Sequence, residues 1–392
     1  MRILTYSTLY PNAAEPGHGP FVEHRLRQLL STGRVASTVV APVPWFPSKN
    51  PRFGRYARFA AAPAFETRHD IPVAHPRFPV IPRVGMNLAP TLLERYSRAA
   101  VLRALADAPG TRLIDAHYFY PDGVAAAMLG QRLKLPVVIT ARGTDISLIP
   151  QYRFPRKRIL WAADCAAGII TVCKALKDSL VDMGVDAAKI TVLRNGVDFS
   201  VFYPRPLAES RQLTGIENKT LLSVGLLNER KGHHLVIEAL TQLPGLKLVI
   251  VGDGPMRDEL EALAGRLDVA DRVRFAGRVP QDQLPAYYSA ADALVLASSR
   301  EGMANVLLES IACATPVIAT PLWGTPEVVA EPAAGVLTRD RSVAALIDAT
   351  RRLYDNFPSA DATLAYAKNF SWDETSDGQI QLFEKIIAGQ DS

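Results

Sequence analysis

Twelve short runs of Val, Ile and Leu recur along this chain, and each is followed by a stretch with helical periodicity. Apolar strands that alternate with helices are typical of a parallel sheet covered by helices on both faces. The runs are Ile3–Thr5, Val35–Ala41, Leu113–His117, Val137–Thr140, Gly168–Val172, Ile190–Leu193, Leu221–Val224, Leu246–Val251, Val273–Ala276, Ala293–Ala297, Pro316–Ala319 and Val336–Leu337. Because the series occurs twice, the sequence predicts an α/β protein with two doubly wound domains.

The two series are separated by residues 194–206, where an Asn-Gly pair and two prolines stop regular structure. We therefore expect an N-terminal domain over 1–198 and a C-terminal domain over 199–370. From Ser371 onward, a capping serine and apolar residues at helical spacing predict a closing amphipathic helix over 371–392. We expect this helix to pack back toward the N-terminal domain.

The cysteines exclude some classes of protein. Cys165, Cys173 and Cys313 form no C-x-x-C pair, which argues against a disulfide framework or a zinc site and for a reducing compartment. No signal peptide is visible, and no run approaches the roughly 18 apolar residues of a membrane span. We expect a cytoplasmic protein.

Charge is distributed unevenly. Residues 1–200 carry 26 basic and 14 acidic side chains, a net charge of +12, and the remainder carries a net charge of −7. A basic half can bind anionic ligands, an anionic membrane or nucleic acid, or it can be an unevenly charged solvated surface. The charge alone leaves these interpretations open.

One basic segment has a more specific composition. Residues 45–59 alternate four cations with five aromatic residues and contain no acid, a mixture that suits a lipid headgroup interface. We expect peripheral contact with an anionic membrane, on its inner face. The alternative is an ordered lid over the acceptor. The segment lies within Pro42–Arg83, where we expect a long irregular loop.

Two loops of the second half follow predicted strands, where doubly wound sheets bind ligands. The first, Gly225–Gly232, contains Arg230 and Lys231, which either neutralise a diphosphate or form an ordinary surface pair. In the second, Gly252 and Gly254 flank an aspartate, and glycines there let a ligand approach the backbone.

A third loop, Ser298–Ser310, is the most informative. A helix entered near Met303 would leave the backbone N–H groups of residues 302–305 free to bind an anion. Glu301 precedes that turn and Glu309 follows two turns later, and a carboxylate accepts two hydroxyl hydrogen bonds from a sugar diol. Alternatively, Glu301 only interacts with the helix dipole and Glu309 is solvated.

These features together resemble the GT-B glycosyltransferases, and most of all their retaining family-4 group, over nearly the whole chain. The resemblance rests on the Asn-Gly-Val-Asp linker, the three loops, the two glutamates seven residues apart, and the segments Pro316–Thr320 and Gly324–Val329. It implies the GT-B fold, with two Rossmann-like domains facing a central cleft. It also implies a nucleoside-diphosphate sugar as donor, with no cofactor. No Asp-x-Asp pair, the arrangement that holds a metal on the diphosphate in the other large glycosyltransferase fold, occurs in the sequence, so we expect no metal.

The resemblance also implies roles for particular residues. It places Arg230, Lys231, Glu301 and His117 in catalysis and Asp145 on the acceptor side. It gives donor binding to Gly17, Gly19, Gly225, Gly252, Gly254, Arg278, Val279, Gly302, Met303, Ala304, Asn305 and Glu309. Glu309 would hold the ribose, Arg230 and Lys231 the diphosphate, and the backbone of Arg278 and Val279 the base. The chain departs from the family pattern at Leu226, where Arg is common, and at Ala314, where Gly is common.

The implied function is retaining transfer of a sugar onto a hydroxyl of a glycan or lipid-linked acceptor, in bacterial-type polysaccharide or glycolipid assembly, with no nucleic acid as partner. Two alternatives remain open: a nucleotide-sugar-binding partner without turnover, and a sugar-nucleotide epimerase on the same fold. No G-x-G-x-x-G follows a strand and no P-loop motif occurs, which disfavours a dehydrogenase or a P-loop ATPase.

Overall fold

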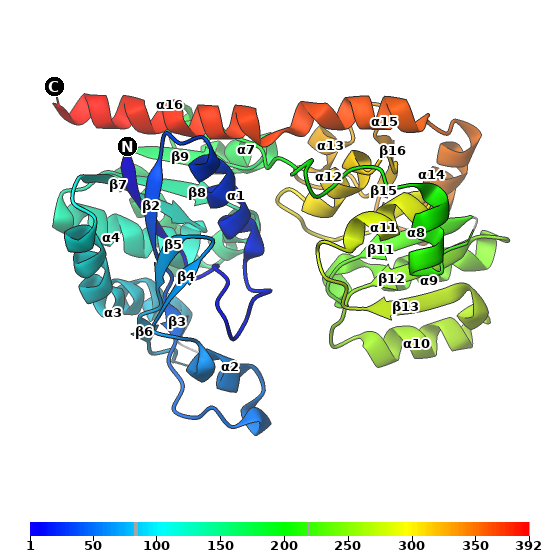
Figure 1. The fold of residues 1–392 in the computed structure, drawn as a ribbon, viewed down its shortest axis with the longest axis horizontal. Coiled ribbons are helices and arrows are strands. Elements are labelled where there is room, and N and C mark those ends of the chain that lie inside the picture. The colour runs from blue at the N-terminus through cyan, green and yellow to red at the C-terminus, as the bar shows by residue number, and fades with distance from the viewer. Residues whose placement is uncertain (82–84, 218, 392) are drawn as a thin grey trace. The chain divides into compact units, whose positions relative to one another are not determined.

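A computed structural model describes residues 1–81, 85–217 and 219–391. The chain forms two compact units (Figure 1), which are described separately. The first comprises Met1–Arg194 together with Asp373–Ser392, and the second comprises Asn195–Trp372. The chain therefore leaves the first unit at residue 194 and returns to it for its last helix.

The main sheet of the first unit has the strand order β10-β9-β8-β7-β1-β2-β5-β4. Its strands are β1 (Arg2–Tyr6), β2 (Ala36–Val40), β4 (Phe65–Arg68), β5 (Ile71–Ala74), β7 (Thr111–His117), β8 (Val137–Ala141), β9 (Gly168–Thr171) and β10 (Ile190–Val192). All neighbours run parallel except β4, which pairs antiparallel with β5. The strand order reverses between β1 and β7, and doubly wound sheets bind ligands at such a switch point.

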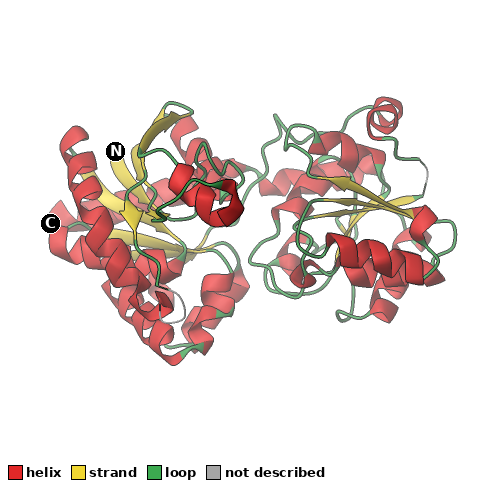
Figure 2. Ribbon diagram, turned by 90° about the horizontal axis from the view of Figure 1, so that it is seen from below, coloured by secondary structure: helices red, strands yellow, loops and turns green. Residues whose placement is uncertain are grey.

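Helices cover both faces of this sheet (Figure 2). The helices of this unit are α1 (Pro20–Ser31), α2 (Arg55–Ala61), α3 (Gly85–Asp107), α4 (Val124–Leu133), α5 (Thr144–Ser147), α6 (Arg153–Cys165), α7 (Lys174–Asp182) and α16 (Trp372–Asp391). Helix α2 lies away from the main sheet, beside β3 (Val43–Pro44).

The segment Pro42–Arg83 is more ordered than expected. The prediction of an irregular loop is wrong, because the segment contains α2, the β4–β5 hairpin and a two-stranded parallel ribbon of β3 (Val43–Pro44) and β6 (Arg77–Phe78). The hairpin turns at His69 and Asp70, whose φ angles are 49° and 64°. Such angles favour glycine, so the turn lacks its usual sequence signal. Residues 82 and 83 lie outside the described ranges.

The second unit contains a six-stranded, fully parallel sheet with the order β13-β12-β11-β14-β15-β16. Its strands are β11 (Thr220–Val224), β12 (Lys247–Val251), β13 (Val273–Gly277), β14 (Ala293–Leu296), β15 (Val317–Ala319) and β16 (Gly335–Leu337). Its helices are α8 (Leu207–Thr214), α9 (His233–Ala239), α10 (Arg257–Arg266), α11 (Leu284–Ala290), α12 (Asn305–Ala312), α13 (Thr325–Val328), α14 (Val343–Asp355) and α15 (Ala360–Ala367). Here the switch point lies between β11 and β14.

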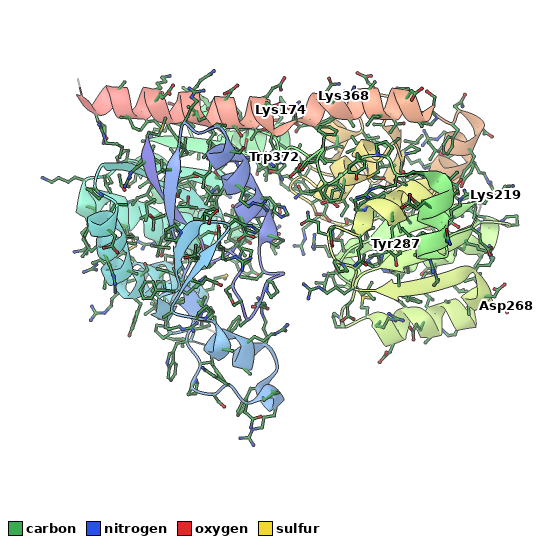
Figure 3. The ribbon with its side chains drawn as sticks, viewed as in Figure 1. Lys174, Lys219, Asp268, Tyr287, Lys368 and Trp372 are labelled. Carbon is green, nitrogen blue, oxygen red and sulfur yellow. The ribbon has the colours of Figure 1, made fainter. Side chains whose placement is uncertain are left out.

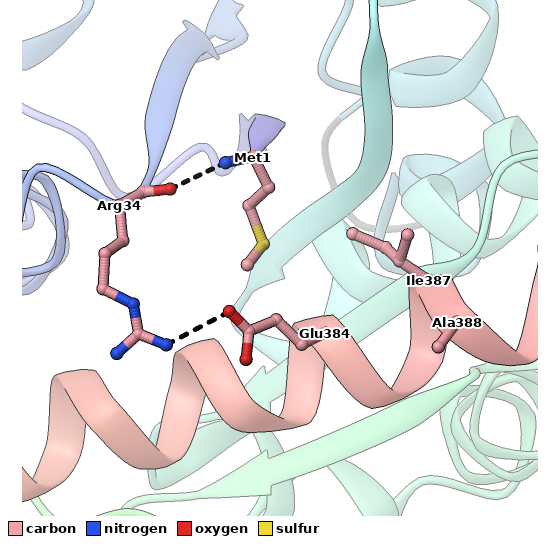
Figure 4. Close-up of a pocket in the computed structure, with 5 residues that line it drawn as sticks. All are labelled: Met1, Arg34, Glu384, Ile387 and Ala388. Carbon is pink, nitrogen blue, oxygen red and sulfur yellow. Dashed lines mark hydrogen bonds and ion pairs between the residues drawn. The ribbon is translucent and has the colours of Figure 1, made fainter.

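The last helix, α16, is part of the core of the first unit. Its Ile380 and Phe383 are fully buried in a cluster with Ile3, Val138 and Ile170 from the sheet. Burying side chains of this size contributes about 1.5–3 kcal/mol each. At the rim, Arg34 pairs with Glu384 of α16 at 3.1 Å (Figure 4), so apolar and ionic contacts both hold the helix on this unit.

The chain enters and leaves the second unit at one place. Val197 N donates to Phe370 O at 2.8 Å, and a Cβ added to Gly196 would lie 2.7 Å from the backbone nitrogen of Trp372. Trp372, labelled in Figure 3, begins α16. The glycine of the Asn-Gly pair is therefore needed for close passage of two backbone segments.

Candidate functional site

The switch point of the second unit brings together three residues that the sequence singles out. The loop after β11 and the loop after β14 lie against each other, with Ser299 N donating to Arg230 O at 2.7 Å. Glu301 Oε1 accepts hydrogen bonds from Lys231 Nζ at 2.8 Å, Arg230 at 3.2 Å and Ser298 Oγ at 2.8 Å.

The electrostatics of this group favour an anionic ligand. Burial by itself raises the pKa of Glu301, but its ion pairs with Lys231 and Arg230 and its hydrogen bonds from Lys231 and Ser298 outweigh that effect, so the pKa is lowered and the carboxyl is ionised. Two cations then face one carboxylate, which leaves one positive charge uncompensated. The Lys231 side chain is only 12% exposed, so its charge is poorly screened by water.

Backbone N–H groups lie next to this charge. Helix α12 begins at Asn305, slightly later than the expected start near Met303. Within the described residues, the N–H groups of Gly302, Met303 and Ala304 donate to no protein acceptor. Free N–H groups at a helix N-terminus bind anions. Asn305 itself accepts a hydrogen bond from Asn195 Nδ2 at 2.9 Å.

The glycines of the neighbouring loops permit close packing of backbone on backbone. A Cβ added to Gly252 would lie 1.8 Å from Gly225 O, and one added to Gly254 would lie 2.4 Å from Leu227 O. Gly225 itself has a φ of 156° and lies against the Lys231 side chain. These glycines are therefore required where the loops pack against each other. This packing role is separate from the donor contact predicted for them.

Glu309 lies along α12, and the structure adds a partner that the sequence did not indicate. Tyr288 of α11 donates its hydroxyl to Glu309 Oε2 at 2.7 Å. Burial raises the pKa of Glu309 to about 7, against the lowering effects of the Tyr288 hydrogen bond and of Lys231. The carboxyl therefore titrates near neutral pH. No spacing rule links Tyr288 to Glu309, so only the fold could identify it.

The remaining predicted positions of this unit lie near the same strand ends. Arg278 and Val279 directly follow β13, and Gly277 accepts a hydrogen bond from Gly252 N at 2.8 Å.

The two departures from the family pattern lie at Leu226 and Ala314. Leu226, where the family commonly has Arg, is 54% exposed. Ala314 has a φ of 60°, the left-handed conformation that costs a non-glycine residue roughly 1–2 kcal/mol.

In the first unit, the predicted glycine loop lies between β1 and α1. Gly19 has a φ of 67°, and a Cβ there would lie 2.5 Å from backbone atoms of Leu9, so only glycine fits. Gly17 is exposed. Helix α1 begins directly after this loop, at Pro20.

His117 ends β7 at the switch point and is only 1% exposed. Its Nε2 lies 3.2 Å from Asp115 Oδ2 and its Nδ1 lies 2.8 Å from Arg142. Arginine can only donate, so Nδ1 accepts and the ring proton lies on Nε2. Burial lowers the pKa of His117, against the effect of Asp115, and the ring is neutral with both nitrogens in use.

Asp145, expected on the acceptor side, is fully buried. Its Oδ2 accepts from Phe119 N at 2.7 Å, its Oδ1 accepts from Gly143 N at 2.7 Å, and both oxygens lie 3.1 Å from Arg142 N. This geometry favours a role in fixing the loops after β7 and β8. Arg142 and Asp115 were not among the predicted site residues, although both adjoin predicted motifs.

Comparisons with known proteins decide the family. The sequence model described as "Glycosyl transferases group 1" matches residues 208–370, and "Glycosyltransferase Family 4" matches residues 56–201. A D-inositol 3-phosphate glycosyltransferase of Acidothermus cellulolyticus is 31% identical over 322 residues, which cover 74% of this chain and 71% of that protein. The chain belongs to the group 1 glycosyltransferases.

Further relatives of this group 1 glycosyltransferase match over more of its length. A Bacillus subtilis protein named as a candidate teichuronic acid biosynthesis glycosyltransferase, TuaC, is 29% identical over 361 residues, which cover 90% of this chain and 89% of that protein. Anabaena Alr3699/HepE in complex with UDP has a TM-score of 0.76 at 22% identity, covering 98% of this chain and 100% of that chain. Sucrose-phosphate synthase of Thermosynechococcus elongatus also has a TM-score of 0.76, at 19% identity and 99% coverage of both chains. The predicted GT-B fold is confirmed.

No helix in the described part of this glycosyltransferase is long and apolar enough to cross a bilayer. Among the same residues, no three His, Cys, Asp or Glu side chains gather in a group that could hold a metal ion.

Proposed function

We propose that this group 1 glycosyltransferase transfers a sugar from a nucleoside-diphosphate sugar to an acceptor hydroxyl, with retention of the anomeric configuration. The observation that carries the proposal is the uncompensated positive charge of Arg230 and Lys231 beside the free N–H groups of residues 302–304 at a switch point. Together they suit a leaving diphosphate. The solved complex of HepE with UDP supports a nucleotide ligand for this fold.

In this mechanism the bond between the sugar C1 and the β-phosphate oxygen breaks as negative charge develops on the diphosphate. Lys231, Arg230 and the free N–H groups stabilise that charge. The departing phosphate oxygen takes the proton of the acceptor hydroxyl, whose oxygen bonds to C1 on the same face. The products are the glycoside and the nucleoside diphosphate. No protein base and no metal ion is required, because protein cations carry out the charge stabilisation.

For the acceptor, we propose a glycan or a lipid-linked sugar in bacterial-type polysaccharide or glycolipid assembly. The relative named for teichuronic acid biosynthesis supports a polysaccharide, and it matches across 90% of this chain. The D-inositol 3-phosphate glycosyltransferase relatives act, by their names, on a small phosphorylated acceptor, and they match over less of the chain.

A ligand panel followed by turnover tests this function. UDP, GDP, ADP and their sugars are screened by thermal shift, because a ligand at about 100 times its dissociation constant stabilises the fold by ~2.7 kcal/mol. The stabilising donor is then incubated with acceptors in excess EDTA, and the product anomer is assigned by NMR. Loss of turnover in EDTA that magnesium restores contradicts metal independence, and an inverted product contradicts retention. Binding without transfer indicates a nucleotide-sugar-binding partner, and an epimerised donor indicates an epimerase.

We further propose that residues 45–59 bring the protein to the inner face of an anionic membrane, where a lipid-linked acceptor lies. Residues 49–56 are all exposed, and the exposed fractions of Trp45 and Tyr56 are both 57%. The rings of Phe46 and Tyr56 pack on each other, with centroids 5.2 Å apart. This supports an aromatic surface cluster more than a lid whose rings pack on the domain.

Vesicle co-sedimentation tests the membrane contact. Each cation near an anionic surface contributes about 1 kcal/mol, so four give ~4 kcal/mol, and binding should be reversible and salt-sensitive. Replacing Lys49, Arg52, Arg55 and Arg58 with Ser should abolish recovery with anionic vesicles at low salt. The charge-matched control replaces the exposed Lys247, Arg266, Arg339 and Arg351 of the second unit. Equal recovery with neutral and anionic lipid excludes this role.

A further inference from the structure

Five polar side chains form a buried series of hydrogen bonds that joins α16 to the end of β7. Arg25 Nε donates to Gln379 Oε1 at 3.0 Å, and Gln379 Nε2 donates to Asp115 Oδ2 at 3.0 Å. The same Asp115 oxygen lies 3.2 Å from His117 Nε2, and Arg142 lies 2.8 Å from His117 Nδ1. The exposed fraction of Arg25, Gln379, Asp115 and His117 is 1% each, so water does not replace a missing partner.

The direction of each bond follows from chemistry. A guanidinium can only donate, so Gln379 turns its carbonyl oxygen to Arg25 and its amide nitrogen to Asp115. The same argument at Arg142 puts the His117 proton on Nε2, which donates to Asp115. One carboxylate oxygen therefore receives two N–H groups, one from α16 and one from the ring that ends β7.

Helix α16 has other contacts that hold it in place. Ile380 and Phe383 are buried in the apolar cluster of the sheet, and Arg34 forms exposed ion pairs with Asp377 and Glu384. A buried amide is therefore not needed to dock the helix. Instead, the Gln379 amide lies between the buried Arg25 guanidinium and the buried Asp115 carboxylate and forms a hydrogen bond with each of them.

We propose that Gln379 is a positioning residue, whose amide fixes the Asp115 carboxylate and through it the proton and the orientation of the His117 ring. The strand that ends in His117 borders the switch point of the first unit. The inference rests on the proposed function and on the catalytic role that the family resemblance implies for His117. It gives the last helix a part in sugar transfer through the hydrogen bonds of Gln379 to Arg25 and Asp115.

Two substitutions in the full-length protein separate helix docking from positioning. Gln379→Met matches the glutamine in size and forms neither bond. Gln379→Glu keeps an acceptor for Arg25 but can donate to Asp115 only while protonated. Within the described residues, the charged partners of position 379 are Arg25 of α1 and Asp115 of β7, and His117 and Arg142 interact in turn with Asp115 and Arg25.

At saturating donor, we expect Gln379→Met to lower kcat by about tenfold to a hundredfold, as small misplacements at reacting groups do, and to leave the donor KM within about twofold. For Gln379→Glu, we expect kcat to fall as the pH rises, because the introduced carboxyl loses the proton that it donates to Asp115. The wild type has no titrating group at position 379 and should lack this descending limb of the pH profile. In histidine-labelled protein, the wild-type His117 NMR signals should report the Nε2–H tautomer, and Gln379→Met should shift them because Asp115 has lost a donor.

The matched control is Ile380→Val, which loosens α16 by an apolar contact only and should lower Tm with kcat near wild type. Unchanged His117 signals with kcat within twofold in Gln379→Met overturn the inference, as does an equal kcat loss in Ile380→Val. If Gln379→Met fails to fold, the pH limb of Gln379→Glu decides. A wild type that transfers no sugar refutes the proposed function, and the His117 signals then still decide this inference.

Discussion

The two units share a doubly wound topology but use the carboxyl ends of their strands differently. In the second unit, Lys231 and Glu301 lie beside free backbone N–H groups, and a positive charge is left for a ligand. In the first unit, His117 and Asp145 are buried, and their polar atoms are bonded to other protein groups. From this difference we expect substitutions of the charged residues in the second unit to change donor binding and rate directly. Substitutions in the first unit should act through the framework, as for Asp145, or through positioning, as for Gln379.

The largest effect is expected for Lys231→Ala. Removing a donor that meets charge developing in the transition state typically lowers kcat by about 10²–10³-fold. Donor affinity should change less, because Glu301 neutralises Lys231 before the reaction. Steady-state kinetics measure both, with the exposed Lys247→Ala of the same unit as control. Near-wild-type kcat in a folded Lys231→Ala protein removes this residue from the site.

The next effect concerns Glu309 and pH. Burial raises its pKa to about 7. If Glu309 holds the ribose, as the family resemblance implies, its ionised form accepts the hydroxyl hydrogen bonds, so donor affinity should rise with pH and level off above about 7. Below that value the affinity should fall by up to about tenfold per pH unit. Calorimetric titration across pH 5.5–8.5 measures the profile.

Glu309→Gln is the control for this profile. It should weaken donor binding by about tenfold to a hundredfold, because a hydrogen bond to a charged group is worth about 1.5–3 kcal/mol, and the pH dependence should disappear. A sloping profile that persists in Glu309→Gln assigns the titration to another group.

Asp145→Asn tests the first unit. An amide nitrogen would face a backbone N–H where a carboxylate oxygen now accepts, which costs about 1–3 kcal/mol. Calorimetry should show Tm lowered by about 2–4 °C per kcal/mol. Asp186→Asn, whose exposed amide can turn its oxygen to the one donor, Ala188 N, should cost much less. An unchanged Tm together with a large loss of kcat contradicts the comparison, since Asp145 would then act on the acceptor.

The smallest effect is expected for Leu226→Arg. An added cation at this exposed position should tighten donor binding by about 0.2–1 kcal/mol, or up to about fivefold, and less at high salt. The exposed Leu213→Arg of the same unit adds the same charge elsewhere. Equal effects of the two variants would mean that position 226 lies away from the donor.

Much of the framework is readable from the sequence, because buried parallel strands are continuous apolar runs. All twelve predicted runs coincide with strands. The β4–β5 hairpin was missed, because its strands are short, partly polar and joined by a turn without glycine. Lys231 and Glu301 were each predicted from a loop that follows a strand, whereas their ion pair depends on the strand order, in which β11 and β14 are neighbours.

The missed site residues depend on long-range geometry. Gln379 and Asp115 are 264 positions apart, and no local pattern relates a helix residue to a strand so distant. Tyr288 reaches Glu309 because α11 packs against α12. The role of Asp145 could not be predicted either, because a Gly-Thr-Asp sequence after a strand fits a ligand site equally well. Only the structure shows that backbone N–H groups donate to both of its carboxylate oxygens.

The return of α16 to the first unit has a consequence for synthesis. A ribosome completes strands β1–β10 and then the entire second unit before it makes the helix that covers Ile3, Val138 and Ile170. Until then those side chains are open on one face, and Arg25 and Asp115 have no Gln379 between them. A nascent chain that stops before Trp372 contains the whole second unit but lacks the last helix of the first unit. The first unit therefore becomes fully stable only after the last twenty residues, which form α16, have been translated.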